Sequence, residues 1–95
     1  YILYMQQNNS KKSETIREII AEIVKEERLS QNKSQRLIAD EYDIQRSLFS
    51  RVESSKNEPM LISLWVISEA LGMKLSDLIK KVESRLPKGF SLIEK

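Results

Sequence analysis

Hydrophobic residues recur at three- and four-residue spacing along most of the chain, which is the period of an amphipathic helix. The first such segment runs from about Glu14 to Ser30 or Gln31. We expect Asn32 to end it in a left-handed conformation, with Lys33 in the link that follows. Its apolar stripe consists of Ile16, Ile19, Ile20, Ile23 and Val24. Because these residues are all β-branched, tertiary packing rather than intrinsic propensity must hold this helix.

The next apolar positions predict two short helices joined by a tight turn, over residues 35–42 and 45–53. Ser34 is a good N-cap for the first helix, since its hydroxyl can accept from free amides of the first turn. Asp43 stands where a left-handed residue is needed to turn the chain. The small Ala39 allows the two helices to approach closely. The inward positions are Ile38, Tyr42, Ile44, Phe49 and Val52. This is the spacing of a helix-turn-helix motif.

Two further helices follow a polar stretch that ends at Pro59, which stands just before a helix start. We expect Gly72 to end the first of them as its C-cap. Ser76 is expected to cap the second, which finishes before Pro87. The inward positions are Leu61, Leu64, Trp65, Ile67, Ser68 and Leu71 in the first, and Leu78, Ile79 and Val82 in the second. The pattern therefore predicts an all-α fold of five helices around one core.

The same pattern divides the chain into three parts. Residues 1–13 are predicted to be a flexible arm, 14–86 a helix-turn-helix domain, and 87–95 a C-terminal tail. Because Met5 follows a short apolar stretch, we expect it to be the native start and residues 1–4 to be foreign to the natural protein. A frayed terminus is the simpler interpretation of the arm. The alternative is a basic arm in which Lys11 and Lys12 follow DNA.

The composition excludes several classes of function. The chain has neither cysteine nor histidine, so disulfides, thiolate metal sites and Ser-His or Cys-His catalysis are ruled out. No apolar run is long enough to cross a bilayer. We expect a cytoplasmic protein that needs no cofactor and no membrane, since a chain without cysteine fits a reducing compartment. A net charge of +2 does not by itself indicate a nucleic-acid binder, so that argument depends on where the charges lie.

From Ser34 to Ile79, about half of the chain, the sequence resembles the Xre/Cro/CI-type helix-turn-helix domains of bacterial and phage regulators, such as the lambda repressors. The matching residues, found without a gap, are Ser34, Gln35, Ala39, Ile44, Ser47, Ser50, Arg51, Val52, Glu53, Asn57, Glu58, Pro59, Leu61, Leu64, Ile67, Glu69, Ala70, Leu71, Gly72, Leu75, Ser76, Asp77 and Leu78. A helix-turn-helix pattern alone is a weak signal. One followed at the right spacing by Pro59 and the Glu-Ala-Leu-Gly helix end is strong. The resemblance implies a lambda-repressor-like fold, here with an extended first helix.

In such domains the second helix of the motif lies in the major groove of DNA, with its N-terminal residues facing base edges. The resemblance implies base contacts by Gln45, Arg46, Ser47 and Arg51. Helical spacing agrees, since Ser47 and Arg51 lie four residues apart on the face opposite Phe49. Contacts to the DNA backbone are expected from Gln35, Lys33, Arg36, Lys56 and Asn57. Taken singly, each of these side chains is more often an ordinary surface residue.

The resemblance also implies a structural ion pair. In the family, an acid at the position of Glu53 pairs with a basic residue of the first helix, which here is Arg28. Breaking one partner of such a pair costs about 3–5 kcal/mol when the pair is well buried. Glu27 and Lys33 differ from the family pattern, because both stand where apolar residues are usual.

The function that we expect is sequence-specific binding of double-stranded DNA at a palindromic operator, by a homodimeric transcriptional regulator that acts as a repressor. An antitoxin-type autoregulator, with a toxin or effector as protein partner, is a close alternative. A protein-interaction module that keeps the fold without binding DNA is an alternative of another class. A nuclease with Mg²⁺ held by Asp40, Glu41 and Asp43 is a distant third, and we interpret these acids as a solvated helix back and a turn residue. We expect no enzyme.

Two apolar segments exceed what the core needs, namely the isoleucine stripe of the first helix and the tail residues Phe90, Leu92 and Ile93. A contiguous exposed apolar patch is a usual sign of an interface. We expect these segments to pair between subunits. The alternative is that the tail folds back on its own first helix in a monomer.

Overall fold

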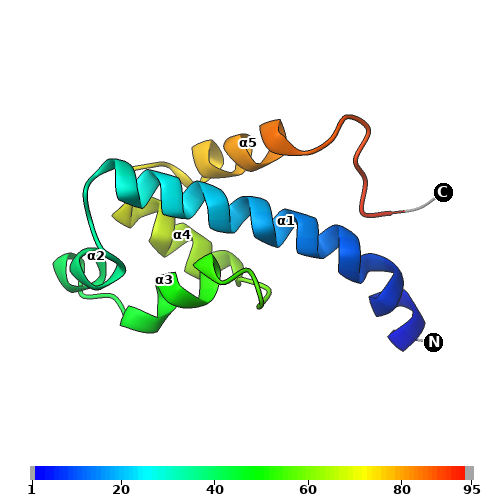
Figure 1. The fold of residues 1–95 in the computed structure, drawn as a ribbon, viewed down its shortest axis with the longest axis horizontal. Helices are drawn as coiled ribbons and strands as arrows, with labels where there is room; N and C mark the ends of the chain where they lie inside the picture. Colours follow the sequence, from blue (N-terminus) through cyan, green and yellow to red (C-terminus); the bar gives the residue numbers. More distant parts are fainter. Residues whose placement is uncertain (1, 94–95) are drawn as a thin grey trace.

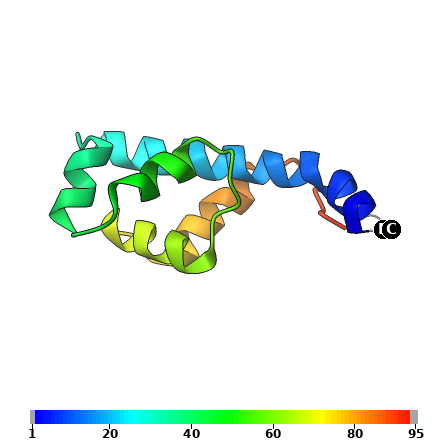
Figure 2. The same cartoon turned by 90° about the horizontal axis from the view of Figure 1, so that it is seen from below.

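The computed structural model describes residues 2–93, with side chains from residue 11 onward, and every regular element in that range is a helix. The helices are α1 (Ile2–Ser30), α2 (Gln35–Glu41), α3 (Arg46–Glu53), α4 (Leu61–Ala70) and α5 (Leu75–Arg85). Figure 1 shows α1 as the long axis of the molecule, with α5 along one side and α2 and α3 on the other. Helix α3 packs against α1 and α2, and Figure 2 shows it beside α1 when the molecule is seen from below. The predicted fold of five helices is confirmed.

Helix α1 begins at Ile2, so the expected start near Glu14 is wrong. This first part of α1 extends beyond α2–α5 (Figure 1). A helix that extends past the packed bundle needs no apolar stripe, and its sequence therefore carries no period. The division into arm, domain and tail stays a prediction, with Tyr1 of the arm and residues 94–95 of the tail outside the described residues.

Most of the helix boundaries follow from short-range capping chemistry. The hydroxyl of Ser34 accepts from the amide of Leu37 at 3.0 Å, as predicted for an N-cap. Asn32, Asp43 and Gly72 all have positive φ, at 58°, 53° and 77°, and each stands two residues after the last residue of a helix, so that Leu71 rather than Gly72 is the C-cap of α4. Apart from that shift of one residue, these predictions are confirmed because each depends only on the residue and its immediate neighbours.

The cap of α5 is an exception, because Ser76 does not cap it. The helix begins at Leu75, and Lys74 stands at the N-cap. The Lys74 carbonyl accepts from the amides of Asp77 and Leu78 at 3.0 and 3.1 Å. Leu75 is partly buried against the core, and this packing accompanies a helix start two residues earlier than predicted.

The inner faces of all five helices meet in one core. Its residues are Ile20, Ile23, Val24, Ile38, Phe49, Val52, Leu64, Ile67, Ala70, Leu71, Leu78 and Val82. Phe49 is its largest fully buried side chain. Ile16 and Ile19 pack against the same cluster. The isoleucine stripe of α1 is therefore used by the chain's own core, and the expectation that it is a surplus interface is wrong.

Three residues expected to face inward are exposed. Tyr42, Leu61 and Trp65 retain 51%, 60% and 47% of their accessible surface. Tyr42 follows the last turn of α2, where its ring lies 5.6 Å from the ammonium of Lys33. Leu61 and Trp65 belong to α4, whose first seven residues include a single polar side chain, so periodicity gave little indication of its inner face.

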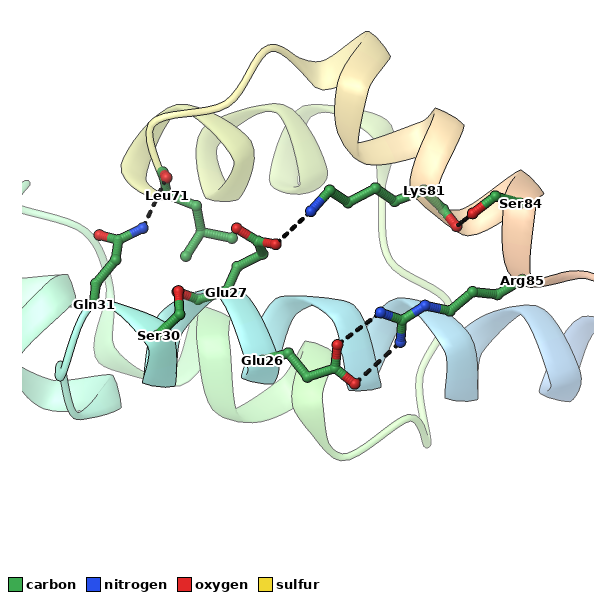
Figure 3. A network of polar contacts seen from close by, with 8 residues as sticks. All are labelled: Glu26, Glu27, Ser30, Gln31, Leu71, Lys81, Ser84 and Arg85. Atoms are coloured by element: carbon green, nitrogen blue, oxygen red, sulfur yellow. Dashed lines mark hydrogen bonds and ion pairs between the residues drawn. The ribbon is translucent and has the colours of Figure 1, made fainter.

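Helices α1 and α5 are joined at the surface by charged side chains (Figure 3). The Arg85 guanidinium donates to both carboxylate oxygens of Glu26, at 2.7 and 3.1 Å, and the hydrogen bonds lower the pKa of Glu26. Lys81 donates to Glu27 at 2.6 Å. Glu27, polar where the family usually has an apolar residue, thus has a cationic partner. We call this set of four residues the α1–α5 clasp.

Candidate nucleic-acid interface

The turn between α2 and α3 is closed by its own backbone. The amide of Ile44 donates to the carbonyl of Ala39 at 2.8 Å, and Asp43 has the positive φ that reverses the chain. Ile44 is partly buried against the core, and Ala39 is fully buried beneath it. Helix α3 then begins at Arg46, with Gln45 at its N-cap. The geometry fixes the direction of α3 relative to α2.

The outer face of α3 is exposed and polar. It consists of Gln45, Arg46, Ser47, Ser50 and Arg51. The opposite face carries Phe49 and Val52, both buried in the core. Buried apolar residues thus hold α3 in place, and its polar side chains remain available to a ligand.

Glu53, the single acidic residue of α3, is withdrawn from that outer face. Its two carboxylate oxygens accept from Nε and Nη2 of Arg28, each at 2.8 Å. The third nitrogen of the guanidinium donates to the carbonyl of Lys33 at 2.7 Å. The two charged side chains are only 7% and 6% exposed, and the hydrogen bonds to Glu53 raise the pKa of Arg28.

This is the ion pair that the resemblance assigned to Arg28 and Glu53. A bidentate arginine–carboxylate pair fixes both distance and orientation, and here it joins α1 to the end of α3. It also neutralises the acid of α3 inside the protein. The outer face of α3 therefore carries Arg46 and Arg51 and no negative charge of its own.

Asp40 brings one negative charge close to the outer face of α3. This exposed residue of α2 lies 3.7 Å from the Nε of Arg46 and 3.9 Å from the Nε of Arg36. Exposed pairs at such distances contribute at most about 1 kcal/mol. The two arginines are thus held loosely and can exchange the carboxylate for a phosphate or a base.

The remaining candidates for backbone contacts lie on either side of α3. Gln35 is the first residue of α2 and is half-buried, while Arg36 beside it is exposed. Lys56 and Asn57 are exposed in the loop after α3. Arg17 of α1 holds this loop by donating to the carbonyl of Ser55 at 3.1 Å.

Lys33 differs from these candidates, because its ammonium already has a partner within the protein. Its ammonium forms a 2.6 Å ion pair with Glu41, and the pair raises the pKa of Lys33. The same ammonium lies over the ring of Tyr42, and the side chain is only 20% exposed. Lys33 is thus less available to DNA than the exposed cations around α3, and its contact with the DNA backbone stays a prediction.

A helix-turn-helix family model matches residues 24–78, which is more than half of the chain. The match spans the end of α1, the α2–α3 motif, α4 and the first turn of α5. The chain belongs to this helix-turn-helix family. Nothing in the curated proteins or the solved structures matches the chain. Family membership supports a DNA-binding regulator, since the family consists of DNA-binding regulatory domains that are not typically enzymatic.

In this helix-turn-helix domain, sequence reasoning missed two residues that help to form the candidate interface. Ser50 lies on the outer face of α3, and its spacing of three residues from Ser47 could have identified it. Arg17 was missed because the backbone carbonyl that it holds, that of Ser55, lies 38 residues away in the chain. Nothing in the local sequence indicates such a contact.

The acidic residues beside the helix-turn-helix motif have cationic neighbours. Asp40 faces Arg36 and Arg46, and Glu41 binds Lys33. Among the described residues, no group of three or more potential ligand side chains is arranged to hold a metal ion. In the same part of the chain, no helix combines the length and the apolar character needed to cross a membrane.

Proposed function

We propose that this protein reads double-stranded DNA through the outer face of α3, and that it acts as a homodimeric transcriptional repressor at a palindromic operator. The observation that carries the proposal is the charge of that face. Its two arginines are exposed, while the acid of the same helix is buried against Arg28. A polyanion can approach such a face without meeting a carboxylate from α3.

Sequence would be read by side chains near the start of α3. Arg46 and Arg51 can each donate two hydrogen bonds to O6 and N7 of a guanine, which is the commonest specific contact in the major groove. Gln45 can pair with an adenine in the same way. Ser47, one turn before Arg51, can bond to a base or a phosphate.

The DNA backbone would be held from both ends of the motif. The amide groups at the start of α2, beside Gln35, carry partial positive charge and suit a phosphate oxygen. Arg36 adds a positive charge on the same side. Lys56 and Asn57, in the loop after α3, would bind phosphates of the DNA backbone. Lys33 is left out of this set because Glu41 already binds its ammonium.

A dimer follows from the number of bases that one helix can contact. A single α3 reads too few base pairs to distinguish an operator from the many competing sites of a genome. Two copies, with their α3 helices about 34 Å apart, would read two half-sites on one side of the duplex. Repression then needs only that the bound dimer covers the operator.

The test begins with selection of bound duplexes from a random pool. Arg51→Ala should weaken binding to the selected site by about 1–3 kcal/mol and relax the preference at one base pair. Lys56→Ala should weaken binding to all DNA sequences alike. It should also reduce the slope of the logarithm of the binding constant against the logarithm of salt concentration by about one, which corresponds to one lost phosphate contact. Lys80→Ala, which removes the same charge from an exposed position on α5, is the matched control.

Three results in this experiment decide the proposal. Selection of a defined sequence, lost preference in Arg51→Ala and unchanged binding by the control would support it. If neither Arg46→Ala nor Arg51→Ala changes binding to the selected site, α3 is not the reading helix. If no duplex is enriched and binding is absent at low salt, the protein does not bind DNA.

A further inference from the structure

Helix α4 presents an exposed apolar face. This α4 outer face consists of Met60, Leu61, Ile62, Trp65 and Val66, which are 72%, 60%, 64%, 47% and 38% exposed. Among the described side chains, half of the large hydrophobic residues that are exposed lie in this one stretch. Helical spacing places Leu61, Ile62, Trp65 and Val66 on one side of α4, and Met60 stands at its N-cap.

The α4 outer face is not needed by the fold. The inner face of the same helix is complete, with Leu64, Ile67 and Ala70 buried in the core. At these exposures each outer side chain offers roughly 100 Å², so the face presents on the order of 500 Å² of apolar surface, which is near the upper end for a monomer. A standard interface buries about 800 Å² on each partner, so this apolar face would form the central part of one.

Charge indicates the occupant of this face. Residues 60–68 contain no charged side chain. A different protein is usually selected through several complementary charges, for which this face provides only Glu69, an exposed residue one turn after Trp65 at the end of α4. A two-fold interface between identical subunits instead places the same patch against itself, and in an antiparallel pair the two copies of Glu69 lie at opposite ends of the interface. A face that is apolar except at one end suits such self-association.

We propose that the α4 outer face is the surface through which two copies of this chain associate. The helices pack antiparallel across a two-fold axis, with Ile62 of one copy against Trp65 and Val66 of the other. The role of this interface, which is to hold two α3 helices in one dimer, rests on the proposed function. Because only residues 54–60 separate α3 from α4 in the chain, one α3 helix then lies on each side of the axis, as a palindromic operator requires.

The C-terminal tail provides a smaller surface for the same purpose. Leu92 and Ile93 are 41% and 75% exposed, but Phe90 is already partly buried. The α4 outer face is wider and belongs to a rigid helix, whereas the tail after α5 has no regular structure up to residue 93. The proposal therefore assigns the interface to α4 and not to the tail.

The protein contains a probe of this interface, since Trp65 is its single tryptophan. Association through α4 buries the indole, so the fluorescence of the unmodified protein should shift to shorter wavelength as concentration rises. Sedimentation equilibrium over the same range, in the absence of DNA, should show a monomer–dimer equilibrium. A dimer that forms without any change in Trp65 emission would overturn the proposal, and so would a monomer at every concentration.

Substitutions test the same surface. Ile62→Glu places two like charges at the centre of the interface and should raise the dimer dissociation constant by about 100-fold or more. Ile62→Lys should do the same, while an equal mixture of the two variants should form dimers again. Leu29→Glu, on an exposed part of α1, and Leu92→Glu, in the tail, are the matched controls.

Circular dichroism distinguishes lost association from lost folding. If Ile62→Glu is unfolded, Trp65→Ala replaces it, because that residue is half exposed and its truncation leaves the core intact. Dimers that persist in the folded α4 variant, or that disappear only in Leu92→Glu, would overturn the proposal. A folded monomeric variant should still bind a single half-site through α3, whereas loss of DNA binding by a normal dimer would count against the proposed function alone.

Discussion

The outer faces of α3 and α4 belong to consecutive helices, yet they differ completely in chemistry. The α3 face carries arginine, serine and glutamine, whereas the α4 face carries leucine, isoleucine, tryptophan and valine. The inner faces of the two helices, in contrast, are alike and share one core. In this domain the inner faces determine the fold, and the outer faces determine what each helix can bind.

Ion pairs also differ between regions of the molecule. Arg28 and Glu53 are almost fully buried and join α1 to α3 through two hydrogen bonds of 2.8 Å. The pairs of the α1–α5 clasp are largely exposed to water. Burial of a charge without its partner costs several kcal/mol, while an exposed pair contributes little. The buried pair thus sets the position of α3, and the clasp only reinforces a contact that packing already makes.

The largest expected effect comes from breaking the buried pair. Arg28→Ala and Glu53→Ala should each lower the free energy of unfolding by about 3–5 kcal/mol, because each leaves one buried charge without its partner. The double variant should lose much less than the sum. Urea unfolding of the four proteins measures this coupling. Arg28→Lys keeps the charge but not the bidentate geometry, and should recover only part of the loss.

Additive losses in this cycle would show that the two side chains do not stabilise the fold as a pair. Glu53 could then turn its carboxylate toward the α3 face, which would carry a negative charge of its own. A change in DNA binding by a folded Arg28→Lys variant would point to the same conclusion.

Signals within a few residues were enough to predict the motif. Ser34, Asp43 and Gly72 act through their own backbone or nearest turn, so the boundaries that they set could be predicted. The pair of Arg28 and Glu53 followed only from resemblance, because the two residues lie 25 positions apart. Caps and turns can therefore be predicted from neighbouring residues, whereas contacts between helices cannot.

The orientation of α4 could not be predicted for a related reason. A helix reveals its inner side through the contrast between apolar and polar positions, and residues 61–67 offer only Ser63 as contrast. The prediction therefore placed Leu61 and Trp65 inside. The partners of the α1–α5 clasp were missed because surface charges are common and give no indication of which one faces which.

A smaller effect is expected from Asp40, which brings negative charge beside the α3 face. Asp40→Asn should strengthen DNA binding by about 0.5–1 kcal/mol, because it frees Arg36 and Arg46 and removes repulsion of the phosphates. Glu83→Gln, at an exposed position on α5, removes the same charge away from the motif and should have no such effect. Fluorescence anisotropy with labelled duplex measures both. Weaker binding by Asp40→Asn would instead show that Asp40 orients Arg46 for base contact.

The smallest effect is expected in the clasp, which lies away from both outer faces. Hydrogen bonding to Arg85 lowers the pKa of Glu26 in the folded protein. A carboxyl with a lowered pKa stabilises the fold above its ordinary titration range, and this contribution disappears as the pH falls through the lowered pKa. The parent should therefore melt at a slightly higher temperature than Glu26→Gln at neutral pH, and the two melting temperatures should converge in acid.

Glu18→Gln, at another exposed site on α1, is the control. A difference that persists in strong acid would show that the substitution acts through packing and not through the charge of Glu26. Sedimentation and DNA binding at neutral pH should be the same for all three proteins, because the clasp touches neither the α3 nor the α4 outer face.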